Sequence, residues 1–172
     1  MMTAMVSRQG RQFQRYNNSG RRRVVGCIPY KFNLNKSSSE GVDKRVEVLV
    51  ISSQKGYGMM FPKGGWEKDE NIEQAALREA WEEAGVQGDI ESELGKWSYK
   101  SKSQDIMHEG VMFPLNVTEE LVRWPEMNVR KRQWVSVEEV KKGCPHSWMI
   151  DALDRLIARL RHQSMLTDNI FN

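Results

Sequence analysis

The pattern of apolar and polar positions divides this chain of 172 residues into strands, an acidic helix and a C-terminal helix. Residues 23–32 and 46–52 are rich in β-branched and aromatic side chains, which is typical of strands. The second run is almost continuously apolar and predicts a strand covered on both faces. Residues 33–44 have loop composition, with a Ser-rich centre. Shorter strands are predicted at 59–61, within 90–100, at 110–118 and at 133–135. Pro114 predicts an edge strand or a bulge in the third of these.

Three segments carry helix signals. Residues 71–84 follow a Gly-Gly turn and end at Gly85, and Ser136 followed by two glutamates predicts a capped short helix over 136–142. Residues 147–161 place apolar side chains at i, i+3, i+4 and i+7, which indicates a packed structural helix. Strands on either side of a central helix, with a helix at the C-terminus, predict an α/β fold, specifically an α/β/α sandwich with a mixed central sheet. The expected organisation is a partly disordered segment 1–19, one domain over 20–162 and a frayed tail 163–172.

Composition narrows the class of protein. The chain is 39% hydrophobic and 28% charged, with a mean hydropathy of −0.65, as expected of a single soluble domain. No run of about 18 apolar residues is present, so no membrane span is expected. Cys27 and Cys144 lack metal-like spacing and predict reduced thiols. The N-terminal stretch is basic before its first acid, Glu40, and resembles a transit peptide in composition, although Arg21 to Arg23 run directly into a core strand. Cytoplasm with nuclear access is preferred, and mitochondrial targeting stays open.

The most informative segment is GGWEKDENIEQAALREAWEEAGV, from Gly64 to Val86. In a helix, Glu79, Glu82 and Glu83 lie at i, i+3 and i+4, so their carboxylates share one face. Three like charges within one turn destabilise a helix unless a partner of opposite charge is present. A hard divalent cation with oxygen ligands, Mg²⁺ above all, fits that requirement, and Mn²⁺ can substitute because carboxylate sites accept both. The competing interpretation is a solvated amphipathic helix kept soluble by its glutamates.

This segment resembles the Nudix box, G-x5-E-x7-R-E-U-x-E-E-x-G-U, where U is a bulky aliphatic residue. The fixed positions match except for the first U, which is Ala80 here, and that departure is expected to weaken packing behind the helix. The resemblance implies the Nudix fold, with the box forming a loop-helix-loop, and hydrolysis of a phosphoanhydride. It also implies that Glu70 and Arg78 pair to brace the helix against its loop, and that a main-chain carbonyl at Gly64 serves as a further metal ligand.

Hydrolysis of an anhydride requires neutralised phosphate oxygens and an activated water. Glu79 and Glu83, one turn apart, are the expected metal ligands. Glu82 is the expected base, because a carboxylate among like charges has a raised pKa, closer to the working pH. It is also a candidate metal ligand. Gly64 and Gly65 allow the backbone to approach metal and phosphate closely. Lys63 is placed to contact a phosphate oxygen, or is an ordinary surface lysine.

Beyond the box, the chain resembles the diphosphoinositol polyphosphate phosphohydrolase branch of the family, particularly its plant-type members. The segments that carry this resemblance are QRY at 14–16, GRRRVVGCIPY at 20–30, VLVISSQKG at 48–56, MMFPKGGWE at 59–67, GKW at 95–97, WPE at 124–126 and VRKRQW at 129–134. The resemblance implies ligand contacts from Arg23, Ser52, Ser53, Lys102 and Arg130, with His108 nearby. The implied partner is a small-molecule polyphosphate.

The distribution of basic residues supports an anionic ligand independently. Basic side chains recur at strand ends and loops, where they suit a ligand with many phosphates; they are Arg21, Arg23, Lys55, Lys63, Lys100, Lys102, Arg130 and Arg132. Alternation places Arg21 with Arg23, and Arg130 with Arg132, on common faces. The alternatives are surface solubility and, for 130–132, a nucleic-acid patch, although nucleic acid is not the expected partner.

Two other functions stay open at this stage. A diadenosine polyphosphate or another nucleoside diphosphate derivative would need an aromatic platform, for which the candidates are Trp66, Trp97, Tyr99 and Trp124. A non-catalytic Nudix module that binds a phospholigand or RNA would be expected to lack at least one metal carboxylate, and none is missing here. A monomer is the default expectation for the assembly.

Overall fold

A mixed sheet forms the centre of the molecule. The computed structural model describes residues 5–101 and 105–171, and within them the strands are β1 (Arg22–Phe32), β2 (Val46–Ile51), β3 (Lys63–Gly65), β4 (Val86–Ile90), β5 (Gly95–Lys100), β6 (Met107–Glu120) and β7 (Arg132–Ser136). The sheet has the order β4-β6-β1-β2-β7, with β3 paired to β1 and β5 paired to β6. β1 and β6 run parallel, whereas the other strand pairs among the described residues are antiparallel, so the predicted mixed sheet is confirmed.

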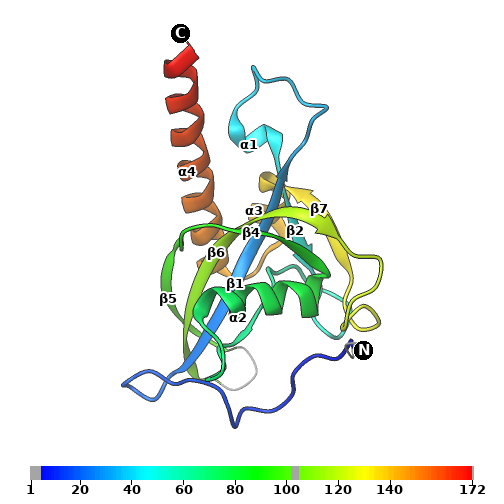
Figure 1. Cartoon of the computed structure of the whole chain (residues 1–172), viewed down its shortest axis with the longest axis vertical. Helices are drawn as coiled ribbons and strands as arrows, with labels where there is room; N and C mark the ends of the chain where they lie inside the picture. Colours follow the sequence, from blue (N-terminus) through cyan, green and yellow to red (C-terminus); the bar gives the residue numbers. More distant parts are fainter. Residues whose placement is uncertain (1–4, 102–104, 172) are drawn as a thin grey trace.

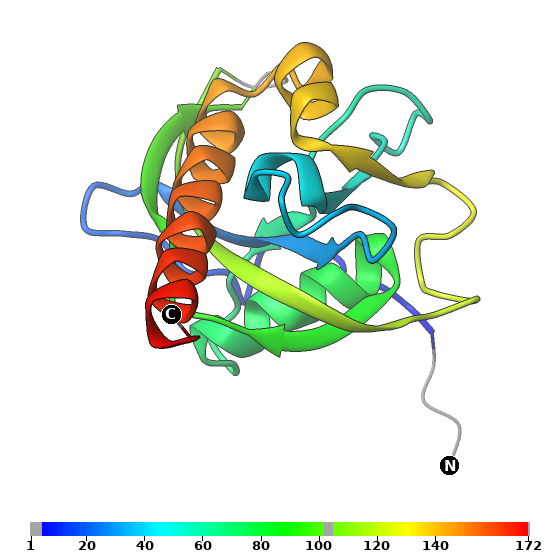
Figure 2. The same ribbon diagram turned by 90° about the horizontal axis from the view of Figure 1, so that it is seen from above.

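Helices cover the two faces of this sheet (Figures 1 and 2). On one side lies α2 (Ile72–Glu79), which continues directly into η1, a π-helix at Ala80–Ala84. On the other side lie α3 (Val137–Gly143) and α4 (Ser147–Phe171), while the short α1 (Val42–Arg45) precedes β2. The described residues contain no helix that is both long and apolar enough to cross a membrane.

The strand residues alternate between two hydrophobic clusters. In β1, Val25 and Cys27 pack with the buried alanines of α2 and η1, whereas Ile28 and Tyr30 pack with the apolar stripe of α4. β2 divides in the same way between its two faces. A strand that is apolar at successive positions is therefore buried on both sides, as the sequence predicts. Cys27 and Cys144 are both buried thiols.

Several boundaries differ from the sequence-based predictions. Residues 59–61 form only an isolated bridge between Ile51 and Met60, and the strand that enters the glycine turn is β3. The predicted loop 33–44 contains the start of α1, and β4 was not predicted because its pattern is too polar on one face. α4 extends beyond the helix predicted for 147–161 and reaches Phe171.

The prediction that Pro114 marks an edge strand is wrong. Pro114 lies inside β6, which is flanked by β1 on one side and by β5 and then β4 on the other. The antiparallel partner changes at this residue, since β5 pairs up to Met112 and β4 begins at Leu115. The carbonyl of Pro114 accepts a hydrogen bond from the amide of Glu91, so the missing N–H faces the junction of the two strands, where no ladder bond is lost.

Candidate active site

The Gly64–Val86 segment forms a loop, a helix and a turn on one face of the sheet. Asn71 caps α2 through a reciprocal capping box with Gln74. Gly85 ends η1 with φ 64°, a left-handed conformation that glycine adopts without strain. A Cβ on Gly64 would collide with the carboxylate of Glu79, so glycine at that position permits the close approach of loop and helix.

Arg78, near the end of α2, is the centre of an ion-pair network between α2, η1 and the loop that precedes α2. Its guanidinium lies 2.7 Å from a carboxylate oxygen of Glu70, 2.7 Å from one of Glu79 and 3.2 Å from one of Glu82. It also donates to the carbonyl of Gly65 at 2.9 Å. The Glu70–Arg78 pair expected from the resemblance is therefore present, and it ties the helix to the preceding loop.

The three box glutamates at positions 79, 82 and 83 are all buried, but their side chains point in two directions. Glu79 lies against Gly64, and Glu83 accepts a hydrogen bond from the amide of Lys63 at 3.2 Å. Glu82 instead accepts from the amide of Arg8, in the N-terminal segment, at 2.9 Å. The π-helical turn changes the angular spacing of these residues relative to the α-helix that the sequence predicts. Glu79, Glu82 and Glu83 expose only 7%, 3% and 4% of their surface.

The acidic cluster contains more negative than positive charge. Burial raises the pKa of Glu82, and burial together with the facing carboxylates raises the pKa of Glu79. Burial is also the main cause of the raised pKa of Glu83, opposed by Arg130 and Lys63. Glu126 adds a further carboxylate, held by Arg130 at 2.9 Å. Five carboxylates (Glu70, Glu79, Glu82, Glu83 and Glu126) thus surround Arg78, Arg130 and Lys63.

This donor set suits a hard divalent cation chemically, since buried carboxylate oxygens with excess negative charge are what such an ion neutralises. Within residues 5–101 and 105–171, however, no three His, Cys, Asp or Glu side chains are grouped closely enough to hold a metal as they stand. Arg130 lies 3.2 Å from Glu83, so an arginine compensates the carboxylate in this arrangement.

The segment between β6 and β7 completes the hydrogen bonding of η1. Trp124 Nε1 donates to the carbonyl of Glu83 at 3.2 Å, and the amide of Glu126 donates to that of Glu82 at 3.0 Å. The guanidinium of Arg132 donates to the carbonyls of Ala84 and Gly85 at 3.0 and 3.1 Å and stacks on Trp124. These donors satisfy carbonyls that a helix end otherwise leaves unpaired.

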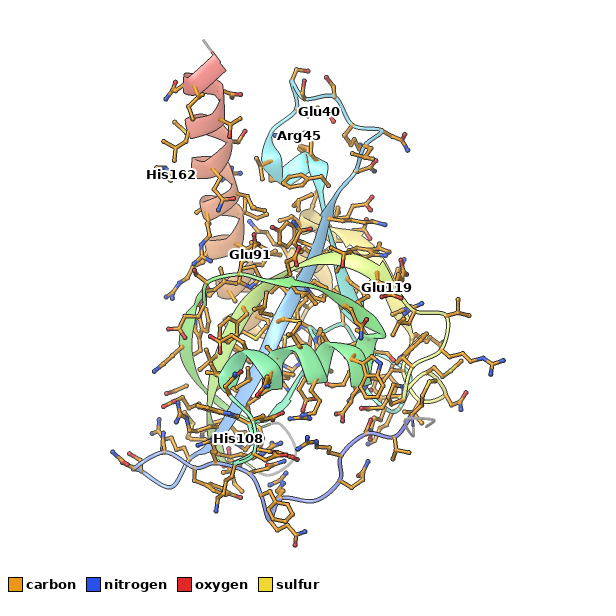
Figure 3. The ribbon with its side chains drawn as sticks, in the orientation of Figure 1. Glu40, Arg45, Glu91, His108, Glu119 and His162 are labelled. Carbon is orange, nitrogen blue, oxygen red and sulfur yellow. The ribbon has the colours of Figure 1, made fainter. Side chains whose placement is uncertain are left out.

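A cationic pocket adjoins the acidic cluster at the same end of the sheet. It has a volume of about 470 Å³, and its charged or titratable lining consists of basic groups together with the phenols of Tyr57 and Tyr99; the basic groups are Arg11, Arg22, Lys63, Lys100, His108 and His146. Arg22 and His108 are register partners on β1 and β6, and Tyr99 faces His108 from β5. Figure 3 shows His108 at the end of the sheet beneath which the N-terminal segment runs.

Electrostatic coupling links this pocket to the acidic cluster. Burial lowers the pKa of Lys63, while the charges of Glu83 and Glu79 oppose that shift. Burial also lowers the pKa of Arg22. The charge of Arg11 lowers this pKa further, and the charge of Glu79 opposes the shift. Lys63 therefore joins the two regions, with its amide on Glu83 and its side chain in the pocket.

The structure distributes the predicted substrate contacts unevenly. Ser53 and Lys63 line the cationic pocket. Arg21 instead donates to Ser98, and Arg23 stacks on Trp66 near Glu109. The remaining predicted contacts also lie elsewhere: Ser52 is buried and accepts from the Lys131 amide, Lys55 is exposed in a turn, Gly64 and Gly65 lie in β3, Arg130 joins the acidic cluster and Arg132 caps η1. Lys102 lies outside the described residues.

Sequence reasoning missed Arg11, Arg22, Arg8 and Glu126. Alternation along β1 shows that Arg22 faces opposite to Arg21 and Arg23, but it does not show which face of the sheet carries the ligand pocket. Arg8, Arg11 and Glu126 lie outside the box, and no local pattern marks them.

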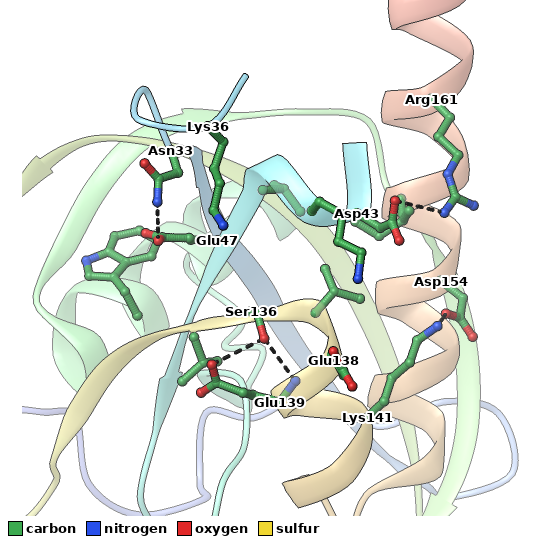
Figure 4. Close-up of a pocket in the computed structure, with 16 residues that line it drawn as sticks. Asn33, Lys36, Asp43, Glu47, Ser136, Glu138, Glu139, Lys141, Asp154 and Arg161 are labelled. Atoms are coloured by element: carbon green, nitrogen blue, oxygen red, sulfur yellow. Dashed lines mark hydrogen bonds and ion pairs between the residues drawn. The ribbon is translucent and has the colours of Figure 1, made fainter. Parts of the chain in front are cut away.

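A larger cavity of about 850 Å³ lies at the opposite end of the sheet, between α1, α3 and α4 (Figure 4). Its lining charges pair with one another: Arg161 with Asp43 at 3.4 Å, and Lys141 with Asp154 at 3.0 Å. None of the box residues lines it. Its size alone does not make it an active site, because it lies away from the box and two of its cations are already paired with carboxylates.

Comparisons with known proteins agree with this geometry. The NUDIX domain model matches residues 21–156. The chain is 56% identical over 159 residues to "Nudix hydrolase 17, mitochondrial" of Arabidopsis thaliana, which covers 92% of this chain and 86% of that protein. It is 33% identical over 141 residues to the human "Diphosphoinositol polyphosphate phosphohydrolase NUDT4B", covering 80% of this chain and 71% of that protein.

A solved structure supports the fold. The "NUDIX hydrolase from Nitrosomonas europaea" superposes with a TM-score of 0.63 at 18% identity, covering 80% of this chain and 89% of that one. At that identity the likeness concerns the fold alone, and it confirms the α/β architecture. With the box matched at every fixed position except Ala80, the family match and the identity to curated relatives taken together, this chain belongs to the Nudix family and is a hydrolase that acts on phosphoanhydrides.

Proposed function

We propose that the substrates of this hydrolase are diphosphoinositol polyphosphates. The observation that carries the proposal is the cationic pocket beside the acidic cluster, whose charged lining within the described residues is entirely basic. A ligand with phosphates on several sides needs cations from several elements, and here they come from the N-terminal segment, β1, β3 and β5. The identity to the human diphosphoinositol polyphosphate phosphohydrolase supports the same substrate class.

The site residues divide into binding and catalytic roles. Family members generally use a divalent metal such as Mg²⁺. Glu79, Glu83 and the carbonyl of Gly64 would hold the ion, with Mn²⁺ as a substitute, and Glu83 would exchange Arg130 for it. When bound, the ion neutralises phosphate oxygens. Glu82 takes the proton of a water whose oxygen attacks phosphorus, and the bridging P–O bond breaks to release phosphate. Glu70 and Arg78 hold the helix, and Arg11, Arg22 and Lys63 hold the other phosphates.

A dinucleotide polyphosphate is the alternative substrate, and Tyr57 is the observation in its favour. This side chain lines the pocket and is 67% exposed, so its ring could stack on a base. The tryptophans considered as platforms are less suitable. Trp66 lies between Arg15 and Arg23, each 4.4 Å from its ring, and Trp124 and Trp97 are covered by Arg132 and Arg155.

The test is Mg²⁺-dependent turnover of a diphosphoinositol polyphosphate and a diadenosine polyphosphate at equal concentration. We expect a higher kcat/KM for the inositol compound. A kcat/KM about tenfold higher for the dinucleotide would reverse the assignment. Such a ratio corresponds to about 1.4 kcal/mol of transition-state binding.

Glu82→Gln separates an enzyme from a binding module. The side chain keeps its size and its hydrogen-bonding oxygen but cannot take a proton. We expect unchanged ligand binding by calorimetry and loss of hydrolysis. A wild-type protein that binds the ligand and turns over neither substrate would instead identify a non-catalytic phospholigand- or RNA-binding module.

Assembly and cellular location are also proposals. We propose a monomer in the cytoplasm, with access to the nucleus. Five of the plant relatives are named mitochondrial, which supports import as the alternative. Fractionation of cells that express the full chain distinguishes the two locations.

A further inference from the structure

The N-terminal residues form a strap across the catalytic loop. We define this strap as residues 7–15, which pass beneath α2 in Figure 1. The amide of Lys68 donates to the carbonyl of Phe13 at 2.8 Å, and the amide of Arg15 donates to that of Trp66 at 2.8 Å. The guanidinium of Arg15 also donates to the carbonyls of Glu67, Lys68 and Glu70 at 3.2, 3.0 and 3.2 Å. Residues 13–15 of the strap are therefore paired with the loop that enters α2.

The first residues of the strap reach the acidic cluster. The amide of Arg8 donates to Glu82 Oε1 at 2.9 Å, and the hydroxyl of Ser7 donates to Glu126 Oε2 at 2.7 Å. The guanidinium of Arg8 pairs with Glu67 and with Asp69. Its side chain thus anchors the strap to the loop, while its main chain faces the carboxylate of Glu82.

Each oxygen of the Glu82 carboxylate consequently has its own donor. Oε1 accepts from the Arg8 amide, and Oε2 accepts from Arg78 at 3.2 Å. A carboxylate with one donor on each oxygen cannot rotate freely. A base that must take a proton from one particular water needs a fixed orientation of this kind.

We propose that the strap positions Glu82, with the main-chain amide of Arg8 as the positioning group. This inference rests on the proposed role of Glu82 as the base. A tail that merely covered hydrophobic surface would need only its pairing with the loop at residues 13–15. The strap also donates from the Ser7 hydroxyl to Glu126 and from the Arg8 amide to Glu82. These contacts to carboxylates of the acidic cluster are not needed to cover hydrophobic surface, and they account for a role in positioning Glu82.

Proline substitution isolates the amide. Arg8→Pro removes the N–H and the side chain, whereas Arg8→Ala removes only the side chain, so their difference reports the donor. Val6→Pro is the matched control, because Val6 is 65% exposed and makes none of these contacts. We expect kcat of Arg8→Pro to be about tenfold below that of Arg8→Ala at unchanged KM, the usual effect of losing one hydrogen bond to a charged group. Val6→Pro should match the wild type. Equal kcat for the two Arg8 variants, or a loss expressed in KM or melting temperature alone, would overturn the proposal.

Combining Arg8→Pro with Glu82→Gln tests whether the strap acts through Glu82. If it does, Arg8→Pro reduces the residual kcat of Glu82→Gln by much less than it reduces that of the wild type. An equal reduction in both backgrounds would contradict the inference. If Glu82→Gln alone leaves kcat unchanged, the assigned role of Glu82 fails, which is a result distinct from a failure of the strap.

Hydrogen exchange gives a readout without activity. In the full-length protein, the Arg8 amide should exchange slowly and should lose its protection in Glu82→Ala, which removes the acceptor. The amide of Arg15, whose acceptor is the carbonyl of Trp66, should keep its protection and serves as the internal control. Unchanged protection of Arg8 in that variant would overturn the proposal even if Glu82→Gln is too slow to assay.

Discussion

At the scale of single residues, Arg21 and Arg22 are sequence neighbours with different surroundings. Arg22 lines the cationic pocket, whereas Arg21 donates to Ser98 at 3.1 Å. Their charges are equal, so the pair separates the effect of position from that of net charge.

We therefore predict that Arg22→Gln raises KM for a polyphosphate substrate about tenfold, because one charge-assisted phosphate contact is lost. Arg21→Gln should change KM by less than about twofold, because Arg21 does not line the pocket. Steady-state kinetics of the two variants on one substrate make the comparison. Equal effects would show that the pocket described above does not bind the substrate.

His108 provides a prediction for pH dependence. Burial lowers its pKa, and Arg22, Lys63 and Arg11 lower it further, while Tyr99 packs against its ring. The folded state therefore favours the neutral imidazole, and the unfolded chain binds the proton first as the pH falls. The stability that depends on neutral His108 is complete above about pH 6.5 and is lost as the pH falls below that value.

Urea denaturation at pH 7.5 and pH 5.5 measures this loss. We expect His108→Gln to lose less stability between the two pH values than the wild type does. His162→Gln, which alters an exposed histidine on α4, should behave as the wild type. A larger loss for His108→Gln would contradict the assigned direction of the shift.

The residues of the box could be predicted from sequence because their spacing is local, whereas the pocket residues could not. Glu79, Glu82 and Glu83 are all buried, but Glu79 and Glu83 lie toward the Gly64 loop while Glu82 faces Arg8, so the single shared face expected from an α-helix is not formed by all three. Arg11 and Arg22 meet Lys63 and His108 only after β1 has paired with β3 and β6. Such pairings depend on tertiary packing, which no window of the sequence contains.

At the scale of elements, the end of η1 depends on a side chain distant in sequence. Arg132 was predicted to bind substrate, but its guanidinium donates to the carbonyls of Ala84, Gly85 and Leu121. The sequence could not indicate this role, because the π-helical turn that leaves these carbonyls to be satisfied is itself not visible in the pattern of glutamates.

Arg132→Gln should therefore lower the free energy of unfolding by about 1–3 kcal/mol, because partly buried carbonyls lose their donors. KM should stay close to the wild-type value. Lys131→Gln is the control, since Lys131 is exposed and contributes its main-chain amide to Ser52. An unchanged unfolding midpoint with a raised KM would restore the substrate-binding role.

Ala80 tests the packing between helix and sheet. The sequence comparison with the box suggested that alanine here weakens the core, yet Ala75, Ala76, Ala80 and Ala84 are all fully buried against β-strand residues. These four small side chains, spread along α2 and η1, allow both helices to lie close to the sheet. We expect Ala80→Leu to destabilise the protein by about 1–3 kcal/mol through overpacking. A raised melting temperature would show that space remains there.

At the scale of the whole molecule, the mixed sheet brings two regions of opposite charge together at one end. The acidic cluster lies on α2 and η1, the cationic pocket lies at the ends of β1, β5 and β6, and Lys63 of β3 contacts both. The α/β/α arrangement was predictable from apolar periodicity and turn residues. The length of α4 and the course of the strap were not, because exposed polar segments give no periodic signal.

We propose that buried carboxylates on one helix bind a divalent cation on which hydrolysis depends. The most direct measurement is the rate of phosphate release from a diphosphoinositol polyphosphate by metal-stripped enzyme during titration with Mg²⁺, for the wild type and for Glu83→Gln. We predict no turnover without metal, saturable recovery for the wild type, and recovery in Glu83→Gln only at Mg²⁺ concentrations at least about tenfold higher. Full activity of the wild type after exhaustive chelation, or identical Mg²⁺ dependence of the two proteins, would contradict the account.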